Sequence, residues 1–240
     1  MRSFHSIARP LFRNAPPTTI HRSPFPALTL NPVHSYPFSI RLSSSSTKPF
    51  TYAIIHGSVR PNRLGERLVK FLQAEITERG DKALIVEANG IPTLEKKYAE
   101  YIAAKEEPPA GLHAIHENLT TADGFVVVTA EYNSTMPPGL TNVMDYFLPE
   151  YNRKPALISS YSYGIFGGIR ASTAARSFLS NLGLITLPSH FPVPNLGDKV
   201  ILPNGKLVDK SFKGRVKIVL DELDWVTDAI RSKRERDVKG

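Results

Sequence analysis

Residues 56–66 read HGSVRPNRLGE, and they join two segments of different character. The segment before them, Phe50–His56 (FTYAIIH), is a short apolar run with β-branched residues, which is typical of a buried parallel strand. The segment after them, Gly65–Arg79, has apolar residues at helical spacing and is followed by Gly80, a residue that favours a helix end. The stretch is therefore predicted to be the turn from a first strand into a first helix.

The rest of the chain repeats this alternation of strand and helix. Further strands are predicted at 83–87, 124–130, 156–161 and, with a weaker pattern, 184–187. Further helices are predicted at 112–122, 139–148, 170–182 and 212–232, with one or two helical turns at 98–105 inside the polar segment 88–108. Alternating elements predict an α/β fold with a parallel sheet covered on both faces. Five such strands fit a flavodoxin-like three-layer sandwich with strand order 2-1-3-4-5.

The positive charge is concentrated at the start of the chain. The formal net charge is +8, but residues 1–50 hold six of the 30 basic residues and no acidic residue, which leaves about +2 on residues 51–240. A nucleic-acid partner is therefore not expected. No run of about 18 apolar residues predicts a membrane span. The absence of cysteine excludes a disulfide framework, a thiolate metal site and a cysteine nucleophile.

Residues 1–48 have the composition of a targeting extension. On a helical wheel the early apolar residues gather opposite the arginines, with Phe4, Ile7 and Leu11 on one side and Arg2, Arg9 and Arg13 on the other. An Arg-rich amphipathic start followed by an acid-free, Ser-rich stretch is typical of a mitochondrial transit peptide, with processing expected near 41–44. We expect a disordered extension over 1–48 and a folded domain over 49–235 in the mitochondrial matrix. A disordered tail on a cytoplasmic protein is the alternative.

The loops after strands one, three and four are expected at the same edge of the sheet. The first, residues 57–65, offers glycine for a tight turn, a serine hydroxyl and a helix start, all of which suit a phosphate group. Arg60 and Arg63 add guanidinium groups that can contact phosphate through two hydrogen bonds. The loop matches neither the Walker motif nor G-x-G-x-x-G. Taken alone, it fits phosphate binding and a solvated basic turn equally well.

The other two loops are also unusual. Residues 129–139 (TAEYNSTMPPG) follow the most apolar strand, and Tyr132, Met136 and the amides around Asn133 can border an isoalloxazine ring or simply cap the next helix. Residues 162–168 (SYGIFGG) contain three glycines, which allow a ligand to approach the backbone closely or form a flexible turn.

Together, the three loops resemble those of the NADPH-dependent FMN reductase family, which includes quinone, azo-dye and chromate reductases. Members carry G-S-x-R after strand one, P-E-Y-N-x-x-x-P-x-x-L-K-N-A-x-D after strand three and a Gly-Gly pair after strand four. The matching stretches here are GSVR (57–60), AEYNSTMPPGLTNVMD (130–145) and SYGIFGG (162–168), and the resemblance covers 51–195. Ala130 replaces the usual proline and Thr141 the usual lysine, and neither change is expected to remove a contact with FMN.

The resemblance implies FMN as cofactor, NADPH or NADH as co-substrate and a small-molecule electron acceptor such as a quinone or a flavin. It implies that the FMN phosphate is held by Ser58, Arg60, Arg63 and Gly65. The flavin would be bordered by Glu131, Tyr132, Asn133 and Ser134, and closed at its other end by Tyr163 and Gly164. Because the flavin carries the hydride chemistry, no catalytic acid or base and no metal are expected in the chain. Relatives also suggest a homodimer or homotetramer that uses 88–108 and the apolar face of 139–148.

Two alternatives remain at this point. A flavodoxin-type electron carrier would bind FMN without being an enzyme, although such carriers are usually strongly acidic and residues 51–240 are nearly neutral. A phosphate-binding regulatory module would bind no flavin. Among the other residues, His56 is expected to be structural, His113 and His116 to lie on a helix surface, and Trp225 to anchor the last helix by packing.

Overall fold

The most apolar stretch of the sequence, Gly124–Ala130, forms the central strand β3, and all seven of its residues are buried. It pairs in parallel with β1 (Thr51–His56) and β4 (Pro155–Tyr161), and the edges of the sheet are β2 (Lys82–Glu87) and β5 (Ile185–Val193). The order β2-β1-β3-β4-β5 confirms the predicted flavodoxin-like sheet. The computed structural model describes residues 49–239, so the predicted extension and targeting signal of 1–48 lie outside the described residues.

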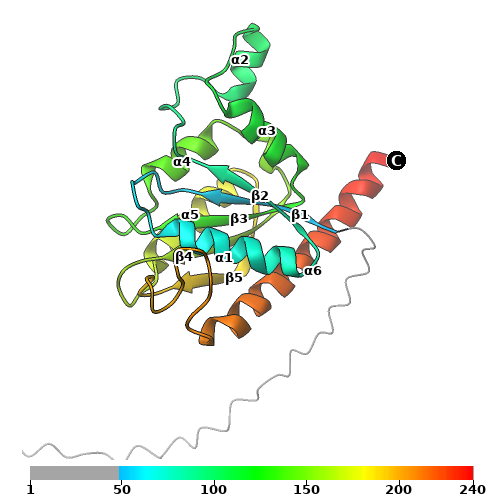
Figure 1. Cartoon of the computed structure of the whole chain (residues 1–240). Coiled ribbons are helices and arrows are strands. Elements are labelled where there is room, and N and C mark those ends of the chain that lie inside the picture. Colours follow the sequence, from blue (N-terminus) through cyan, green and yellow to red (C-terminus); the bar gives the residue numbers. More distant parts are fainter. Residues whose placement is uncertain (1–48, 240) are drawn as a thin grey trace, which may run out of the picture. The chain divides into compact units, whose positions relative to one another are not determined.

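Helices cover both faces of the sheet, as predicted for a three-layer sandwich (Figure 1). On one face, α1 (Gly65–Glu78) and α6 (Ser211–Lys239) form a first core with the strands. On the other face, α3 (Leu112–Thr121), α4 (Pro138–Asp145) and α5 (Ile169–Asn181) form a second core. Burial of these apolar side chains is the main force that holds the helices on the sheet.

The segment between β2 and α3 packs onto the second layer. It contains the short helix α2 (Tyr98–Ala104), which projects beyond the sheet in Figure 1. The amide of Leu94 donates to Oδ1 of Asn142 over 2.8 Å, and Nδ2 of Asn142 donates to the carbonyl of Pro92 over 2.7 Å. The ring of Tyr98 stacks on His116 of α3 with 4.6 Å between centroids. These contacts tie the segment to α3 and α4.

Three predicted elements differ from the structure by more than one residue at an end. The helix predicted at 139–148 ends at Asp145, because Tyr146 and Phe147 turn into the core and a 3-10 turn, η1 (Pro149–Tyr151), follows. The strand predicted at 184–187 is longer in the structure, where it spans Ile185–Val193. The helix predicted at 212–232 continues to Lys239.

Strand β5 includes Pro188 and Pro192, and it tolerates them because it lies at an edge, where a missing N–H breaks few ladder bonds. Its carbonyls also have side-chain partners. Arg176 donates to the carbonyls of Leu187 and Pro188 over 2.7 and 3.0 Å, and Arg215 donates to that of Pro192 over 3.0 Å.

Trp225 is not the packing anchor that the sequence suggested. Its side chain is 55% exposed, whereas Leu220 and Leu223 of the same helix are buried. Trp225 follows Leu223 by two residues, about 200° around the helix, so it lies on the solvent side.

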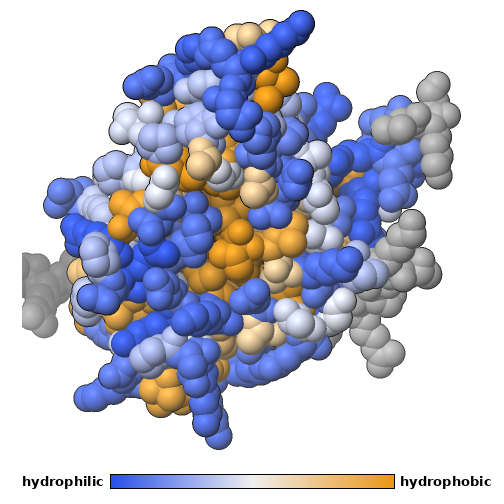
Figure 2. All heavy atoms as spheres, turned by 45° about the horizontal axis from the view of Figure 1, so that its top comes forward, coloured by the Kyte–Doolittle hydropathy of each residue, from blue (hydrophilic) through white to orange (hydrophobic). Residues whose placement is uncertain are grey.

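The surface carries several exposed apolar side chains. Figure 2 shows an apolar area beneath the projecting α2, bordered by hydrophilic residues. The large exposed apolar residues include Tyr163, Ile165 and Phe166 after β4, and Ile218 and Trp225 on α6. None of the helices within 49–239 has the length and apolar character needed to cross a membrane.

Candidate cofactor site

The loop after β1 is held close to the sheet by a backbone hydrogen bond and by close packing at its glycines. The amide of Gly57 donates to the carbonyl of Val128 over 3.1 Å, which continues the pairing of β1 with β3. Ser58 is buried next to it, and Asn62 takes a left-handed conformation with φ 55° that turns the chain toward α1. A Cβ at Gly65 would lie 2.4 Å from Nε2 of His56 and 2.5 Å from the hydroxyl of Tyr161. Only glycine fits at this helix start.

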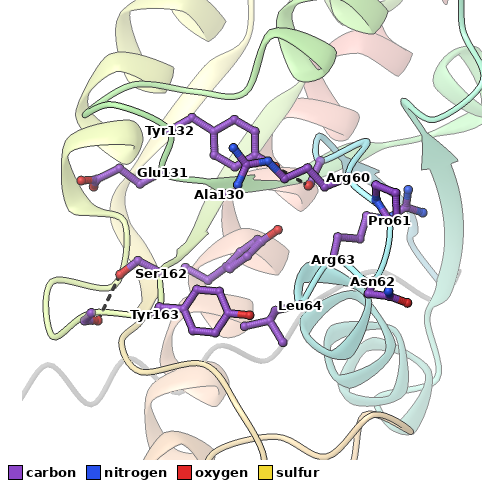
Figure 3. Close-up of a pocket in the computed structure, with 13 residues that line it drawn as sticks. Arg60, Pro61, Asn62, Arg63, Leu64, Ala130, Glu131, Tyr132, Ser162 and Tyr163 are labelled. Carbon is purple, nitrogen blue, oxygen red and sulfur yellow. Dashed lines mark hydrogen bonds between the residues drawn. The ribbon is translucent and has the colours of Figure 1, made fainter.

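A cavity of about 390 Å³ opens where the loops after β1, β3 and β4 meet (Figure 3). The loops after these strands meet at one edge because the strands are parallel, as the sequence predicted. In Figure 3, Arg60 and Tyr132 lie on one side of the cavity, with Leu64 and Tyr163 on the opposite side.

Ser58, Tyr132 and Arg60 form one contacting group at the wall of the cavity. The hydroxyls of Ser58 and Tyr132 are 2.8 Å apart, which is a hydrogen-bond distance. The Arg60 guanidinium carbon lies 4.0 Å from the centroid of the Tyr132 ring. This cation–π contact holds the exposed charged group of Arg60 over the aromatic ring.

Arg63 has different neighbours. Its NH2 group donates to Oε2 of Glu87 over 2.8 Å, and its Nε lies 3.5 Å from Oε1 of Glu66. Nδ1 of His56 lies 3.3 Å from Oε1 of the same Glu87 carboxylate. Burial raises the pKa of Glu87, but the hydrogen bond with His56 and the positive charge of Arg63 outweigh it and leave the pKa below its usual value.

Tyr161 and Ser162, at the end of β4, also line the cavity. Burial raises the pKa of Tyr161 to about 12, so its hydroxyl remains protonated near neutral pH and can donate a hydrogen bond. The sequence reasoning missed both residues, since it began the third loop's binding residues at Tyr163. The signal was present: the last residue of a parallel strand faces the same edge as the loop that follows it.

The loop after β3 makes a tight turn. Tyr132 and Thr135 exchange backbone hydrogen bonds of 2.9 and 3.0 Å, and Asn133 and Ser134 between them have φ values of 50° and 65°. Before the turn, Glu131 accepts hydrogen bonds from the amide and the NH1 group of Arg170 at 3.2 and 2.9 Å. Glu131 thereby links this loop to the start of α5.

Seven of the ten residues predicted to bind the cofactor line the cavity, namely Ser58, Arg60, Arg63, Glu131, Tyr132, Tyr163 and Gly164. The other three do not. Gly65 is buried at the start of α1, behind the loop, while Asn133 and Ser134 lie exposed at the tip of their turn. The individual contacts of these residues with FMN stay predictions. Within residues 49–239, no three His, Asp or Glu side chains gather as metal ligands would.

The residues present fit FMN. The cavity volume lies in the range of about 300–1,000 Å³ that ligand pockets occupy. Its wall offers the Ser58 hydroxyl and the exposed Arg60 to an anion, close to the start of α1. Tyr132 and Tyr163 supply aromatic surface at the other loops, and Tyr163 is 81% exposed. An anionic group and a flat ring can therefore be bound together.

The chain is similar to several known proteins. A family model described as NADPH-dependent FMN reductase matches residues 51–198. A quinone reductase of Escherichia coli K12 is 32% identical over 132 residues, which span 52% of this chain and 70% of that protein. A 2-hydroxy-1,4-benzoquinone reductase of a Burkholderia species is 24% identical over 182 residues, spanning 73% and 96% of the two chains.

A solved structure supports the same fold. The flavoenzyme NAD(P)H:(acceptor) oxidoreductase FerB of Paracoccus denitrificans superposes with a TM-score of 0.63 at 20% identity, covering 74% of this chain and 97% of that one. The region that the family model matches, residues 51–198, contains all three loops that form the cavity. The three loops, the sheet and these matches show that the chain belongs to the NADPH-dependent FMN reductase family. It is an FMN-dependent oxidoreductase that takes electrons from NAD(P)H.

Proposed function

We propose that this enzyme passes hydride equivalents from NAD(P)H, by way of FMN, to a quinone or a similar small acceptor. The observation that carries the proposal is that the loop with Ser58 and Arg60 and the two loops with Tyr132 and Tyr163 line one cavity. The redox chemistry is supplied by FMN when it is bound. The names of the relatives, quinone reductase and 2-hydroxy-1,4-benzoquinone reductase, support a quinone as the acceptor.

The chain's own part is to bind and orient. In this proposal Ser58 and Arg60 receive the phosphate, which is supported by the contacts that both residues make with Tyr132. Tyr163 lines the cavity, and Ile165 and Phe166 in the same loop are exposed as well, so this loop can offer apolar surface to a planar acceptor or a nicotinamide ring. Phe166 is further fixed by Arg170, whose guanidinium carbon lies 5.0 Å from the ring centroid.

A visible spectrum tests the proposal. Purified protein loaded with FMN is expected to show flavin bands that bleach on anaerobic addition of NADPH and return on addition of a quinone. If NADPH bleaches the bands and only free flavin, not a quinone, restores them, the acceptor would be a flavin instead of a quinone. Failure of both NADPH and NADH to bleach a correctly loaded protein would instead favour an electron carrier.

We also propose that the enzyme is a homodimer or homotetramer. The apolar area beneath α2 in Figure 2 supports an association surface there. The apolar side chains Leu140, Val143 and Met144 of α4 are buried within the chain, so α4 can contribute little beyond the exposed Leu148 that follows it. Sedimentation equilibrium of residues 49–240 tests this proposal, and a monomer at micromolar concentration would refute it.

Targeting to the mitochondrial matrix is proposed on sequence alone, from the Arg-rich, acid-free residues 1–48. A fluorescent protein fused after residue 48 should be imported into mitochondria. The same fusion with Arg2, Arg9 and Arg13 replaced by glutamine should remain in the cytoplasm. Cytoplasmic fluorescence of the unmodified fusion would support the alternative of a non-targeting tail.

A further inference from the structure

Glu87 contacts both ends of the loop that is placed to receive the phosphate. It is the last residue of β2 and is the register partner of His56, the last residue of β1. Its Oε2 accepts a hydrogen bond of 2.8 Å from Arg63, near the end of the loop, and lies 3.2 Å from Nδ1 of His56, just before the loop begins. A single carboxylate therefore joins the two ends of residues 57–64.

These contacts lie behind the loop. The side chain of His56 is fully buried, and that of Arg63 is 10% exposed. Within residues 49–239, Nε2 of His56 has no hydrogen-bond partner, and it lies 2.4 Å from the position that a Cβ of Gly65 would take. The Arg63 guanidinium is directed to Glu87 and Glu66 in this arrangement, whereas Arg60 is exposed at the cavity.

We propose that Glu87 is a positioning residue for cofactor binding: through Arg63 and His56 it fixes the shape of residues 57–64, so that Ser58 and Arg60 meet the phosphate. Arg63 then acts chiefly by closing the loop and only secondarily as a phosphate ligand. Joining the ends of a short loop removes conformational freedom that binding would otherwise have to remove. The proposal deepens the proposed function, because it concerns the same FMN site.

Electrostatics and positioning predict opposite signs for a change at Glu87. The FMN phosphate is an anion, so removal of the nearby negative charge would strengthen its binding if long-range charge were all that mattered. If Glu87 positions the loop, loss of its charge weakens binding, because Arg63 and His56 no longer share a negatively charged acceptor. Glu66 offers a matched control, since it also lies beside Arg63, at 3.5 Å, and is about as exposed as Glu87, 49% against 40%, but has no contact with His56.

The first experiment measures FMN and riboflavin affinity by quenching of flavin fluorescence in wild type, Glu87→Gln and Glu66→Gln. We expect Glu87→Gln to weaken FMN about tenfold, as loss of hydrogen bonds to a charged group does, with a much smaller effect on riboflavin, which lacks the phosphate. Glu66→Gln should leave FMN affinity unchanged or slightly raised. Tighter FMN binding by Glu87→Gln, or equal losses for FMN and riboflavin, would overturn the proposal.

A second measurement does not depend on FMN. Amide hydrogen exchange of residues 57–65 in the FMN-free protein should be about tenfold faster in Glu87→Gln than in Glu66→Gln, with the exchange of β3 unchanged. Equal exchange rates would refute positioning even if the wild type bound no flavin. Failure of the wild type to bind FMN, together with faster exchange in Glu87→Gln, would instead refute the proposed function alone.

Arg63→Lys separates loop closure from direct phosphate contact. Lysine keeps a positive charge near the phosphate but replaces the planar guanidinium that Glu87 binds. If Arg63 closes the loop, Arg63→Lys and Glu87→Gln should weaken FMN to a similar extent, and the double variant should be little worse than either. Additive losses in the double variant would contradict the proposal.

Discussion

The hydroxyl of Tyr132 lies 2.8 Å from the hydroxyl of Ser58, so the loop after β3 is hydrogen-bonded to the loop after β1 across the cavity wall. A phosphate oxygen only accepts hydrogen bonds. If Ser58 binds the phosphate, as we propose, it must donate its own proton to the phosphate and accept one from Tyr132. In that arrangement Tyr132 orients the serine proton toward the cavity.

This relationship predicts the effect of Tyr132→Phe. Loss of one hydrogen bond of about 0.5–1.5 kcal/mol should weaken FMN binding roughly two- to tenfold. Fluorescence titration measures it, with Tyr101→Phe on α2 as a control that should behave as wild type. FMN affinity equal to that of wild type in Tyr132→Phe would show that Ser58 needs no such partner.

A second prediction concerns Gly65. Alanine would bring a methyl group within 2.4 Å of a buried histidine nitrogen and 2.5 Å of the Tyr161 hydroxyl. We expect Gly65→Ala to lower the free energy of unfolding by about 1–3 kcal/mol, as overpacking does in other cores. Urea denaturation measures this change.

Gly214→Ala is its control. Gly214 lies in α6, and a Cβ there would meet no atom within 4 Å. This substitution should raise the free energy of unfolding by about 0.5–1 kcal/mol, because alanine favours the helix. A Gly65→Ala variant as stable as wild type would mean that the start of α1 can shift freely.

A third prediction addresses how α6 is attached. Asp224 accepts a 2.8 Å hydrogen bond from the hydroxyl of Tyr52 in β1, and it is also bonded to Arg79. Asp224→Ala should cost about 1–3 kcal/mol of unfolding free energy, since it leaves the buried Tyr52 with only the longer 3.3 Å contact to Thr227.

Asp237→Ala provides the comparison within the same helix. Asp237 pairs with Lys233 on the exposed surface, so its loss should change stability by less than about 0.5 kcal/mol. Chemical denaturation of both variants by guanidinium chloride distinguishes the two sites. Equal effects of the two substitutions would contradict a special role for the contact between Asp224 and Tyr52.

A fourth prediction concerns pH. Lys154 is buried, and its Nζ donates to the carbonyls of Leu119 and Thr120 at 2.7 and 3.0 Å, at the end of α3. Burial, together with the charge of Arg234, lowers the pKa of Lys154 to about 8.

Between pH 8 and the ordinary lysine pKa of about 10.4, the unfolded chain therefore binds more protons at Lys154 than the folded one does, and this residue makes stability rise with pH. The advantage of wild type over Lys154→Met in unfolding free energy should be larger at pH 10 than at pH 7.5. Urea melts at both values measure it. A difference that shrinks as the pH rises would be inconsistent with a lowered pKa.

The sequence predicted the central strands well because they are buried on both faces. The ends of Gly124–Ala130 were predicted correctly, and those of β1 and β4 were predicted to within one residue. A parallel strand covered on both faces appears in the sequence as a continuous apolar, β-branched run, which is easy to delimit. Strand β5 was underestimated because Pro188 and Pro192 interrupt its pattern. Their tolerance depends on an edge position, which is a property of the assembled sheet.

The site was predicted in outline for a similar reason. Strand ends and loops at one sheet edge follow from topology, so Ser58, Arg60 and Tyr132 could be grouped in advance. The link from Arg63 to Glu87 could not, because it joins residues 24 positions apart through the register of β1 on β2. An arginine in a loop suggests phosphate binding from the sequence alone, even when the guanidinium in fact binds a carboxylate of the protein, as Arg63 does.

The two edges of the sheet differ in a way that limits how the protein can assemble or aggregate. An added strand needs free N–H and C=O groups, yet β5 has two positions without an N–H and three carbonyls already bonded to Arg176 and Arg215. The β5 edge therefore lacks some of the N–H donors and some of the free carbonyl acceptors that an added strand would need. Growth by strand addition, in a native assembly or in a misfolded one, is left to the β2 side.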